Sequence, residues 1–243
     1  MARAATEGVQ HDRRIRPHDG AVEEWLAAHG ERWLDPGAVA HTLGAAGITL
    51  PPFAIVTSAQ EAAAAAENVD FPVTVKVISR TLTHKSDFGV VVLDLPSAAA
   101  VEQACTAMLA RVPAGAEVEG LLVQQMITGG VVVIVGVVDD GTFGPLLGFG
   151  LGGTAVEDLN DVVFRITPLT DADAHEMIHA IRGLPFLQGY RGRPSADLAA
   201  IEDLLLRLSW LVEAVPEIVE MDANPVADFA AGEGLALVDV RRR

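Results

Sequence analysis

The sequence contains a single cysteine, Cys105, in 243 residues. One thiol excludes an internal disulfide and a metal site built from several thiolates, so nothing in the chain requires an oxidising compartment. The longest apolar run, residues 131–138, is interrupted by Gly136 and is far shorter than the roughly 20 residues of a membrane helix. Residues 1–20 lack the apolar segment of a signal peptide. We therefore expect a cytoplasmic protein with a flexible N-terminal tail and no membrane partner.

Positive charge is also scarce in this chain. Lys and Arg number 17 against 33 Asp and Glu, which gives a formal net charge of -16. Such a chain repels nucleic-acid backbones and anionic membranes, so we expect no nucleic-acid partner. Half of the residues are apolar and 21% are charged, which excludes global disorder. The length allows one large domain or two smaller lobes that share a cleft.

Hydrophobic periodicity predicts a compact α+β lobe over residues 21–126. Its helices carry Ala and Leu at helical spacing, and its strands are rich in Val and Ile. Two lead-in helices precede a βαββαβ alternation with the helices on one face of a mixed sheet. The expected helices are 21–29, 36–46, 59–67, which Thr57 or Ser58 opens, and one that Ser97 caps and that runs to about Arg111. The expected strands are 53–56, 71–79, 89–95 and 120–126.

A second and larger α+β lobe is predicted over residues 127–243. It begins with a β-prone stretch from Val131, which a glycine-rich segment follows. The remaining elements are predicted as a strand at 162–166, amphipathic helices at 171–181 and 195–215, and strands at 217–221 and 235–240. The fold class is therefore α+β, with two lobes.

Lys76 stands out because it interrupts an apolar strand, and a buried ammonium needs an anion such as a phosphate. Strand alternation equally allows Lys76 to point to a solvated face. The loop that follows reads HKSDFG, residues 84–89, and offers an imidazole, a second lysine and a glycine. Loop amides beside a glycine can bind phosphate, and a histidine can accept a phosphoryl group. A loop histidine can also be an ordinary surface residue.

Three further patterns each allow two interpretations. The segment 143–153 reads FGPLLGFGLGG, whose glycines permit either close approach of a ligand or close packing of two elements. Near the C-terminus, EMDANP and Asp239 place oxygen ligands at two strand ends, as Mg2+ prefers, although an Asx turn at 222–224 explains the first of them equally well. His175 and His179 are four apart on a predicted helix, but no third metal ligand accompanies them.

Together these pieces resemble one family. They follow one another as FPVTVKV, HKSD, LLVQQM, the glycine-rich run, GYRGRP, EMDANP and a terminal VD. This order is similar to the ATP-grasp β subunit of ADP-forming acetyl-CoA (acyl-CoA) synthetases, relatives of succinyl-CoA synthetase. The resemblance covers residues 36–239 and implies the ATP-grasp fold, in which two α+β lobes grip a nucleotide.

The resemblance implies a role for each matching residue. His84 corresponds to the histidine that relays a phosphoryl group from a partner subunit to ADP. Asn224 and Asp239 fall where relatives hold Mg2+, with Asp222 close by. The residues implied in contacts to ATP or ADP are Lys76, Lys85, Ser86 and Gly89 around the phosphates, and Gln125 and Met126 in the hinge beneath the adenine.

The implied activity is the reversible conversion of acyl-CoA, ADP and phosphate into the free acid, CoA and ATP. The CoA site and the primary phosphohistidine belong to an α subunit, so this chain is expected to be half of a hetero-oligomeric acid–CoA ligase.

The chain departs from the family pattern at three positions. Val90 replaces a glycine, Gln125 replaces a hinge glutamate, and Val132 replaces the acidic residue that meets the ribose hydroxyls. These departures favour an alternative, a noncatalytic ATP-grasp module with an eroded nucleotide pocket that acts as a structural or regulatory partner. A third possibility is the ATP-grasp part of a protein acetyltransferase system.

Overall fold

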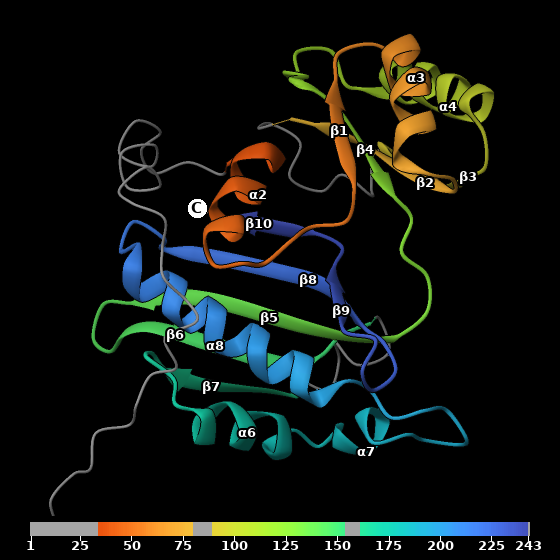
Figure 1. Ribbon diagram of the computed structural model, residues 1–243. Helices are drawn as coiled ribbons and strands as arrows, with labels where there is room; N and C mark the ends of the chain where they lie inside the picture. Colours follow the sequence, from red (N-terminus) through yellow and green to blue (C-terminus); the bar gives the residue numbers. More distant parts are fainter. Residues whose placement is uncertain (1–33, 80–88, 154–160, 243) are drawn as a thin grey trace, which may run out of the picture.

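The computed structural model describes residues 34–79, 89–153 and 161–242. Within these ranges the strands form two antiparallel sheets, one of four strands in the order β1-β4-β2-β3 and one of six in which β10-β8-β5-β6-β7 are consecutive and β9 pairs with β8. The predicted α+β architecture of two lobes is confirmed (Figure 1). Residues 1–20 and the expected helix at 21–29 lie outside the described residues.

The smaller lobe follows the predicted alternation of strands and helices. Val73, Val75 and Val77 of β2 are fully buried against the helical layer, which covers one face of the sheet. Ala62, Ala66 and other small side chains let the helices lie close to the strands (Figure 1). The elements are β1 (Phe53–Val56), α3 (Ala59–Val69), β2 (Val73–Ile78), β3 (Val91–Leu95), α4 (Ala98–Arg111) and β4 (Gly120–Gln125).

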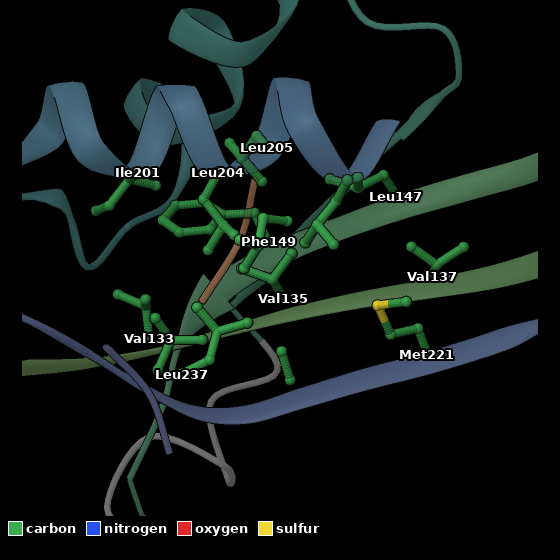
Figure 2. Packing of buried hydrophobic residues seen from close by; sticks show 14 of the residues in the cluster. Val133, Val135, Val137, Leu147, Phe149, Ile201, Leu204, Leu205, Met221 and Leu237 are labelled. Carbon is green, nitrogen blue, oxygen red and sulfur yellow. The ribbon is translucent and has the colours of Figure 1, made fainter. Parts of the chain in front are cut away.

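The larger lobe packs its helices on one face of the six-stranded sheet. Phe149 of β6 is fully buried beneath Leu204 and Leu205 of α8, beside Val135 of β5 (Figure 2). The strands are β5 (Val131–Asp140), β6 (Gly144–Leu151), β7 (Val162–Ile166), β8 (Glu220–Asp228), β9 (Leu235–Leu237) and β10 (Val240–Arg242). The helices are α6 (Asp171–Ala180), α7 (Leu184–Leu187) and α8 (Leu198–Ala214).

The helix starts follow from side-chain capping. Ser58 accepts the amide of Glu61 at the start of α3, and Ser97 accepts that of Ala100 at the start of α4. Each hydroxyl satisfies one of the amides that a helix N-terminus leaves without a partner. Ser97 is thereby confirmed as the cap of α4, and Ser58 rather than Thr57 caps α3.

Helix α2 (Pro36–Ala45) precedes the smaller lobe in sequence but packs with the larger one. Val39 and Leu43 belong to the core cluster of the larger sheet. The Arg207 guanidinium of α8 donates to the Ala46 carbonyl at 3.0 Å and so satisfies the C-terminal end of α2. The sequence-based division groups this helix with residues 21–126, whereas its packing attaches it to the larger lobe.

None of the helices in the described ranges has both the length and the apolar composition needed to cross a membrane.

Candidate functional site

Lys76 lies on the face of the smaller sheet that is turned away from α3 and α4. We call the helix-free face of each sheet its open face. The neighbours of Lys76 along β2, Val75 and Val77, point to the helices, so alternation turns Lys76 to the open face. Its side chain is only 12% exposed, and its ammonium lies 3.6 Å from the Asp239 carboxylate of the larger lobe. The open face is therefore not simply solvated here, because it meets an anion of the other lobe.

The loop after β2 falls largely outside the described residues, and His84, Lys85 and Ser86 are among them. Gly89 is described, and its φ of 61° lies in the left-handed region that favours glycine. A Cβ at Gly89 would lie 3.4 Å from the Arg111 guanidinium at the end of α4. Gly89 therefore brings the chain into β3 through a backbone conformation that most other residues avoid.

Val90 has a structural role that the sequence reasoning missed. From the sequence it stood out only as a replacement of a family glycine at the end of the phosphate loop. In the structure, Val90 is fully buried in the core of the smaller lobe, and its carbonyl accepts the Val77 amide at 3.0 Å. The Val90 side chain therefore points to the helices and stabilises the core, while the phosphate loop at 80–88 that its replacement of glycine concerns lies outside the described residues.

The end of β4 positions the predicted hinge. The Gln125 amide donates to the Pro52 carbonyl at 2.9 Å, and the Met126 amide donates to the Pro72 carbonyl at 3.0 Å. The Thr74 hydroxyl contacts the Met126 sulfur at 3.0 Å. These contacts fix the strand end between two other segments of the smaller lobe.

Gln124 is a polar residue of this strand that sequence reasoning missed. It is buried and pairs with Thr74, so it shares the open face with Lys76. Gln125 pairs with Val73 and is therefore directed to the other face within the sheet. The signal for Gln124 was its alternation with Val123, which packs in the helical core.

The three candidate metal ligands come from adjacent segments of the larger lobe. Asp222 and Asn224 alternate along β8 with the buried Met221 and Ala223, which places both polar residues on the open face. The backbone amide of Asn224 donates to the backbone carbonyl of Asp239 at 3.0 Å, so the connection between β9 and β10 lies directly beside β8. The structure thus brings these oxygen ligands together, as the sequence analysis expected.

Strand β8 is longer than the predicted strand at 217–221. It continues through Asp222 and Asn224 to Asp228, because β5 pairs with one side of it and β9 and β10 pair with the other. The alternative of an Asx turn at 222–224 is therefore wrong.

The electrostatic surroundings of Asp222 are crowded with charge. Partial burial raises the pKa of its carboxyl group, and the carboxylates of Asp239 and Glu220 raise it further. Arg241, directly opposite Asp222 on β10, lowers the same pKa. Mutual repulsion of this kind is relieved when a cation or a phosphate-bound metal joins the carboxylates.

The glycine-rich segment forms β6, and the glycines in its second half up to residue 152 serve packing within the sheet. A Cβ at Gly148 would lie 2.7 Å from the ring of Phe164 on β7. Gly150 is similarly close to the Asp161 carbonyl. Of the two alternatives, close packing of two elements is thus the one that the described contacts support.

His175 and His179 stack on the surface of α6, with ring centroids 4.1 Å apart. The imidazole of His175 forms a hydrogen bond with Glu202 of α8 at 2.8 Å, and that of His179 bonds the His175 carbonyl. In the part of the chain that the structure describes, no group of three or more His, Cys, Asp or Glu is arranged to hold a metal ion. This pair therefore has a structural explanation.

The donor set at Asp222, Asn224 and Asp239 still fits a hard cation in its chemistry. Mg2+ prefers oxygen ligands and is held by one or two carboxylates when phosphate oxygens complete its coordination. The carboxylates of Asp222 and Asp239 and the side-chain amide of Asn224 match that requirement. They are too few to complete the coordination of the metal ion without a ligand. The residues therefore fit a cation that is shared with a phosphate-bearing ligand.

Comparison with known proteins identifies the family of this chain. A model of the ATP-grasp domain matches residues 25–243. The chain belongs to the ATP-grasp family. The chain is 38% identical over 224 residues to the β subunit of acetate–CoA ligase [ADP-forming] II from Pyrococcus furiosus, an alignment that covers 90% of this chain and 94% of the relative. It therefore belongs with the β subunits of ADP-forming acyl-CoA synthetases, as the sequence motifs predicted.

A second relative shows the same unit within a longer polypeptide. The chain is 44% identical over 202 residues to acetate–CoA ligase [ADP-forming] I from Archaeoglobus fulgidus, covering 82% of this chain but 29% of the relative. It thus spans less than a third of that enzyme.

The fold is also that of a solved relative. Dinucleotide forming acetyl-coenzyme A synthetase 1 of Ca. Korarchaeum cryptofilum, solved with coenzyme A and Ca-AMPCP, matches with a TM-score of 0.85 and 34% identity, covering 91% of this chain and 97% of that one. Another structure of that protein, with coenzyme A and Mg-AMPPCP, matches with a TM-score of 0.78 and 32% identity, over the same shares of the two chains.

Proposed function

We propose that this chain is the nucleotide-binding β subunit of an ADP-forming acyl-CoA synthetase. The observation that carries the proposal is the meeting of Lys76, from one lobe, with Asp239, from the other, beside Asn224. A lysine and a set of hard oxygens at one place are what a nucleotide phosphate with its Mg2+ requires. The relative from Pyrococcus furiosus, of nearly the same length, supports this function.

In this function the residues of the chain position and neutralise the phosphates of ADP or ATP. Lys76 binds a phosphate oxygen through a charge-assisted hydrogen bond, and Gly89 shapes the start of β3. Asn224, Asp239 and Asp222 hold Mg2+, which supplies charge neutralisation on the phosphate oxygens when bound. Gln125 and Met126 border the adenine through their backbone at the end of β4, since pairing with Val73 directs the Gln125 side chain to the other face. Lys85 and Ser86, with the neighbouring loop amides, complete the phosphate contacts.

His84 is proposed as the covalent relay. Its imidazole nitrogen attacks the phosphoryl group of the partner's phosphohistidine, whose P–N bond breaks, and a terminal oxygen of ADP then takes the phosphoryl group from His84 to give ATP. Each step exchanges one bond to phosphorus for another, so the protein has mainly to position and neutralise the groups.

The partner in this proposal is a CoA-binding α subunit that carries the primary phosphohistidine. The relative in Pyrococcus furiosus is named as a subunit, whereas the Archaeoglobus fulgidus relative is a single longer polypeptide. Both arrangements supply the remainder of the enzyme, and we propose the separate subunit for this chain.

A calorimetric titration of the chain with ADP and ATP, with and without Mg2+, tests nucleotide binding first. Reconstitution with the CoA-binding subunit, acyl-CoA, phosphate and ADP then tests turnover. We expect ATP only when both subunits are present, and we expect an acid-labile phosphate on this chain that His84→Ala removes.

His175→Ala is a matched control for that experiment, because His175 lies on the exposed surface of α6 and should leave the phosphate in place. Full ATP formation by His84→Ala would contradict the relay, and robust acyl-CoA synthesis by this chain alone would contradict the division between subunits.

Val132 supports a second candidate, a noncatalytic ATP-grasp module. Val132 lies on β5 between the core residues Val131 and Val133, so it is turned to the open face, where a hydrocarbon cannot accept hydrogen bonds from a ribose. The same titration separates the two candidates, because this module would bind neither ADP nor ATP.

A further inference from the structure

The contact between Lys76 and Asp239 joins two residues with different proposed tasks. Lys76 is proposed to bind nucleotide phosphate and Asp239 to bind Mg2+, and their charged atoms lie 3.6 Å apart. The Lys76 side chain is 12% exposed and that of Asp239 is 36% exposed, so the pair is partly shielded from water. Partial shielding strengthens such a pair relative to one on an open surface.

The Lys76 ammonium lies beside several carboxylates of the larger lobe. Asp222 and Glu220 lie on the same strand, and Asp239 is close enough to raise the pKa of Asp222. In the described ranges these side chains do not form a cluster that would hold a metal ion unaided. Arg241, opposite Asp222 on β10, is a cation of the same lobe, and Lys76 adds a positive charge from the opposite lobe beside Asp239.

We propose that Lys76 is a placeholder cation. Its ammonium pairs with the Asp239 carboxylate until a nucleotide binds together with its metal ion. This inference rests on the proposed function and adds an order of events to it. When nucleotide phosphates bind, they offer Lys76 a new anionic partner, and Asp239 becomes free to bind the divalent cation. The cation therefore enters together with the nucleotide.

The exchange keeps the charge at the site balanced at each stage. Without nucleotide, the ammonium of Lys76 neutralises Asp239. With nucleotide, the ammonium neutralises phosphate while the divalent cation bridges phosphate and Asp239. A free divalent cation must instead displace Lys76 without giving the lysine another partner, so metal binding and nucleotide binding are coupled positively.

The experiment measures Mn2+ binding to the full chain in the absence of any nucleotide, by calorimetry and by the electron paramagnetic resonance signal of free Mn2+. Lys76→Met keeps an unbranched side chain that is one atom shorter and removes its charge. We expect this variant to bind Mn2+ at least about tenfold more tightly than the wild type, a change of about 1.4 kcal/mol. Lys76→Arg keeps the charge and should bind Mn2+ as weakly as the wild type.

A second substitution assigns the gain to Asp239. Adding Asp239→Asn to Lys76→Met should abolish the increase in Mn2+ affinity. Equal Mn2+ affinity in the wild type and in Lys76→Met would overturn the proposal, as would an increase that persists in the double variant. Circular dichroism of each variant confirms that the comparison is made between folded chains.

This test is distinguishable from a test of the proposed function. The Mn2+ titrations contain no nucleotide, so they report on Lys76 and Asp239 even if the chain binds no ATP. Conversely, ATP binding by the wild type combined with unchanged Mn2+ affinity in Lys76→Met would preserve the proposed function and reject the placeholder role.

Discussion

The two sheets differ most in what their open faces carry. The smaller sheet presents Lys76 and the buried polar groups of Thr74 and Gln124, while the larger sheet presents Asp222 and Asn224. Each sheet has helices on its other face, α3 and α4 on the smaller sheet and α6 and α8 on the larger one (Figure 1). The chemistry is therefore divided between the lobes, with the cation on one and the oxygen ligands on the other. In the proposed function, a phosphate and its metal ion contact both lobes at once.

The two cores differ as well. The smaller core consists mainly of Ala and Val, whereas the larger one contains Phe149, Met177 and many leucines (Figure 2). Burial of large side chains stabilises a fold in proportion to the apolar area removed from water. We expect the larger lobe to contribute most of the free energy of folding.

The largest expected effect tests this difference between the cores. Phe149→Ala removes a fully buried ring beneath α8 and should lower the free energy of unfolding by about 3–5 kcal/mol. Val123→Ala at a fully buried position of the smaller core removes two methyl groups and should cost about 1–2 kcal/mol. Urea unfolding followed by circular dichroism measures both, and equal losses would refute the expected dominance of the larger lobe.

A second effect concerns the pH dependence of the larger lobe. Asp228 is fully buried at the end of β8, and burial, together with the nearby Asp197 carboxylate, raises the pKa of its carboxyl group to about 7. A raised carboxyl pKa in the folded state contributes stability that is complete below the ordinary Asp value near 3.8 and is lost as pH rises towards about 7.

Asp228→Asn removes this titration while keeping the shape of the side chain. We expect the variant to match the wild type at pH 4 and to be more stable by about 2–4 kcal/mol at pH 8, since an amide does not ionise. Asp203→Asn on the exposed face of α8 is the control and should show no such pH-dependent gain. A difference that does not grow between the two pH values would contradict the raised pKa.

Much of the fold was predictable from local patterns. The strand at 162–166 and the cap at Ser97 were found because alternation and capping depend on residues close together in sequence. The direction of the Val90 side chain was not predictable, because it follows from the hydrogen bond between the Val77 amide and the Val90 carbonyl across the sheet. The function of Gly148 was likewise open until the ring of Phe164 was located beside it.

The candidate site was predictable in its residue types and not in its pairing. Lys76 attracted attention because a charge in an apolar strand needs a partner, but Asp239 lies far along the sequence and in the other lobe. The extension of β8 beyond Asp222 was also missed, because its neighbours β5, β9 and β10 stabilise it from both sides.

The next effect tests the cation of the smaller lobe. Lys76→Ala should weaken ATP binding by roughly 10- to 150-fold, the equivalent of about 1.5–3 kcal/mol for a charge-assisted hydrogen bond. The fold should persist, because Lys76 lies outside the buried core of the lobe. Calorimetry with Mg2+ measures the affinity, and Lys76→Arg should retain most of it. Unchanged ATP affinity in Lys76→Ala would remove Lys76 from the phosphate site.

The smallest expected effect concerns Val132, on the open face of the larger sheet. A carboxylate at this position would accept hydrogen bonds from the ribose hydroxyls, which a hydrocarbon cannot do. A Cβ at Gly152 would lie 2.7 Å from a methyl group of Val132, so the stem of a longer side chain must pass along the Gly152 backbone towards the open face.

We expect Val132→Glu to tighten ATP binding by about fivefold to tenfold and to tighten 2′-deoxy-ATP binding less, since one of the two hydroxyls is then missing. Val132→Gln has the same length without the charge and should give a smaller gain. Calorimetry with Mg2+ on the wild type and the two variants measures these affinities. Low-micromolar ATP affinity in the wild type, or unchanged affinity in Val132→Glu, would show that the nucleotide pocket does not need a carboxylate at this position.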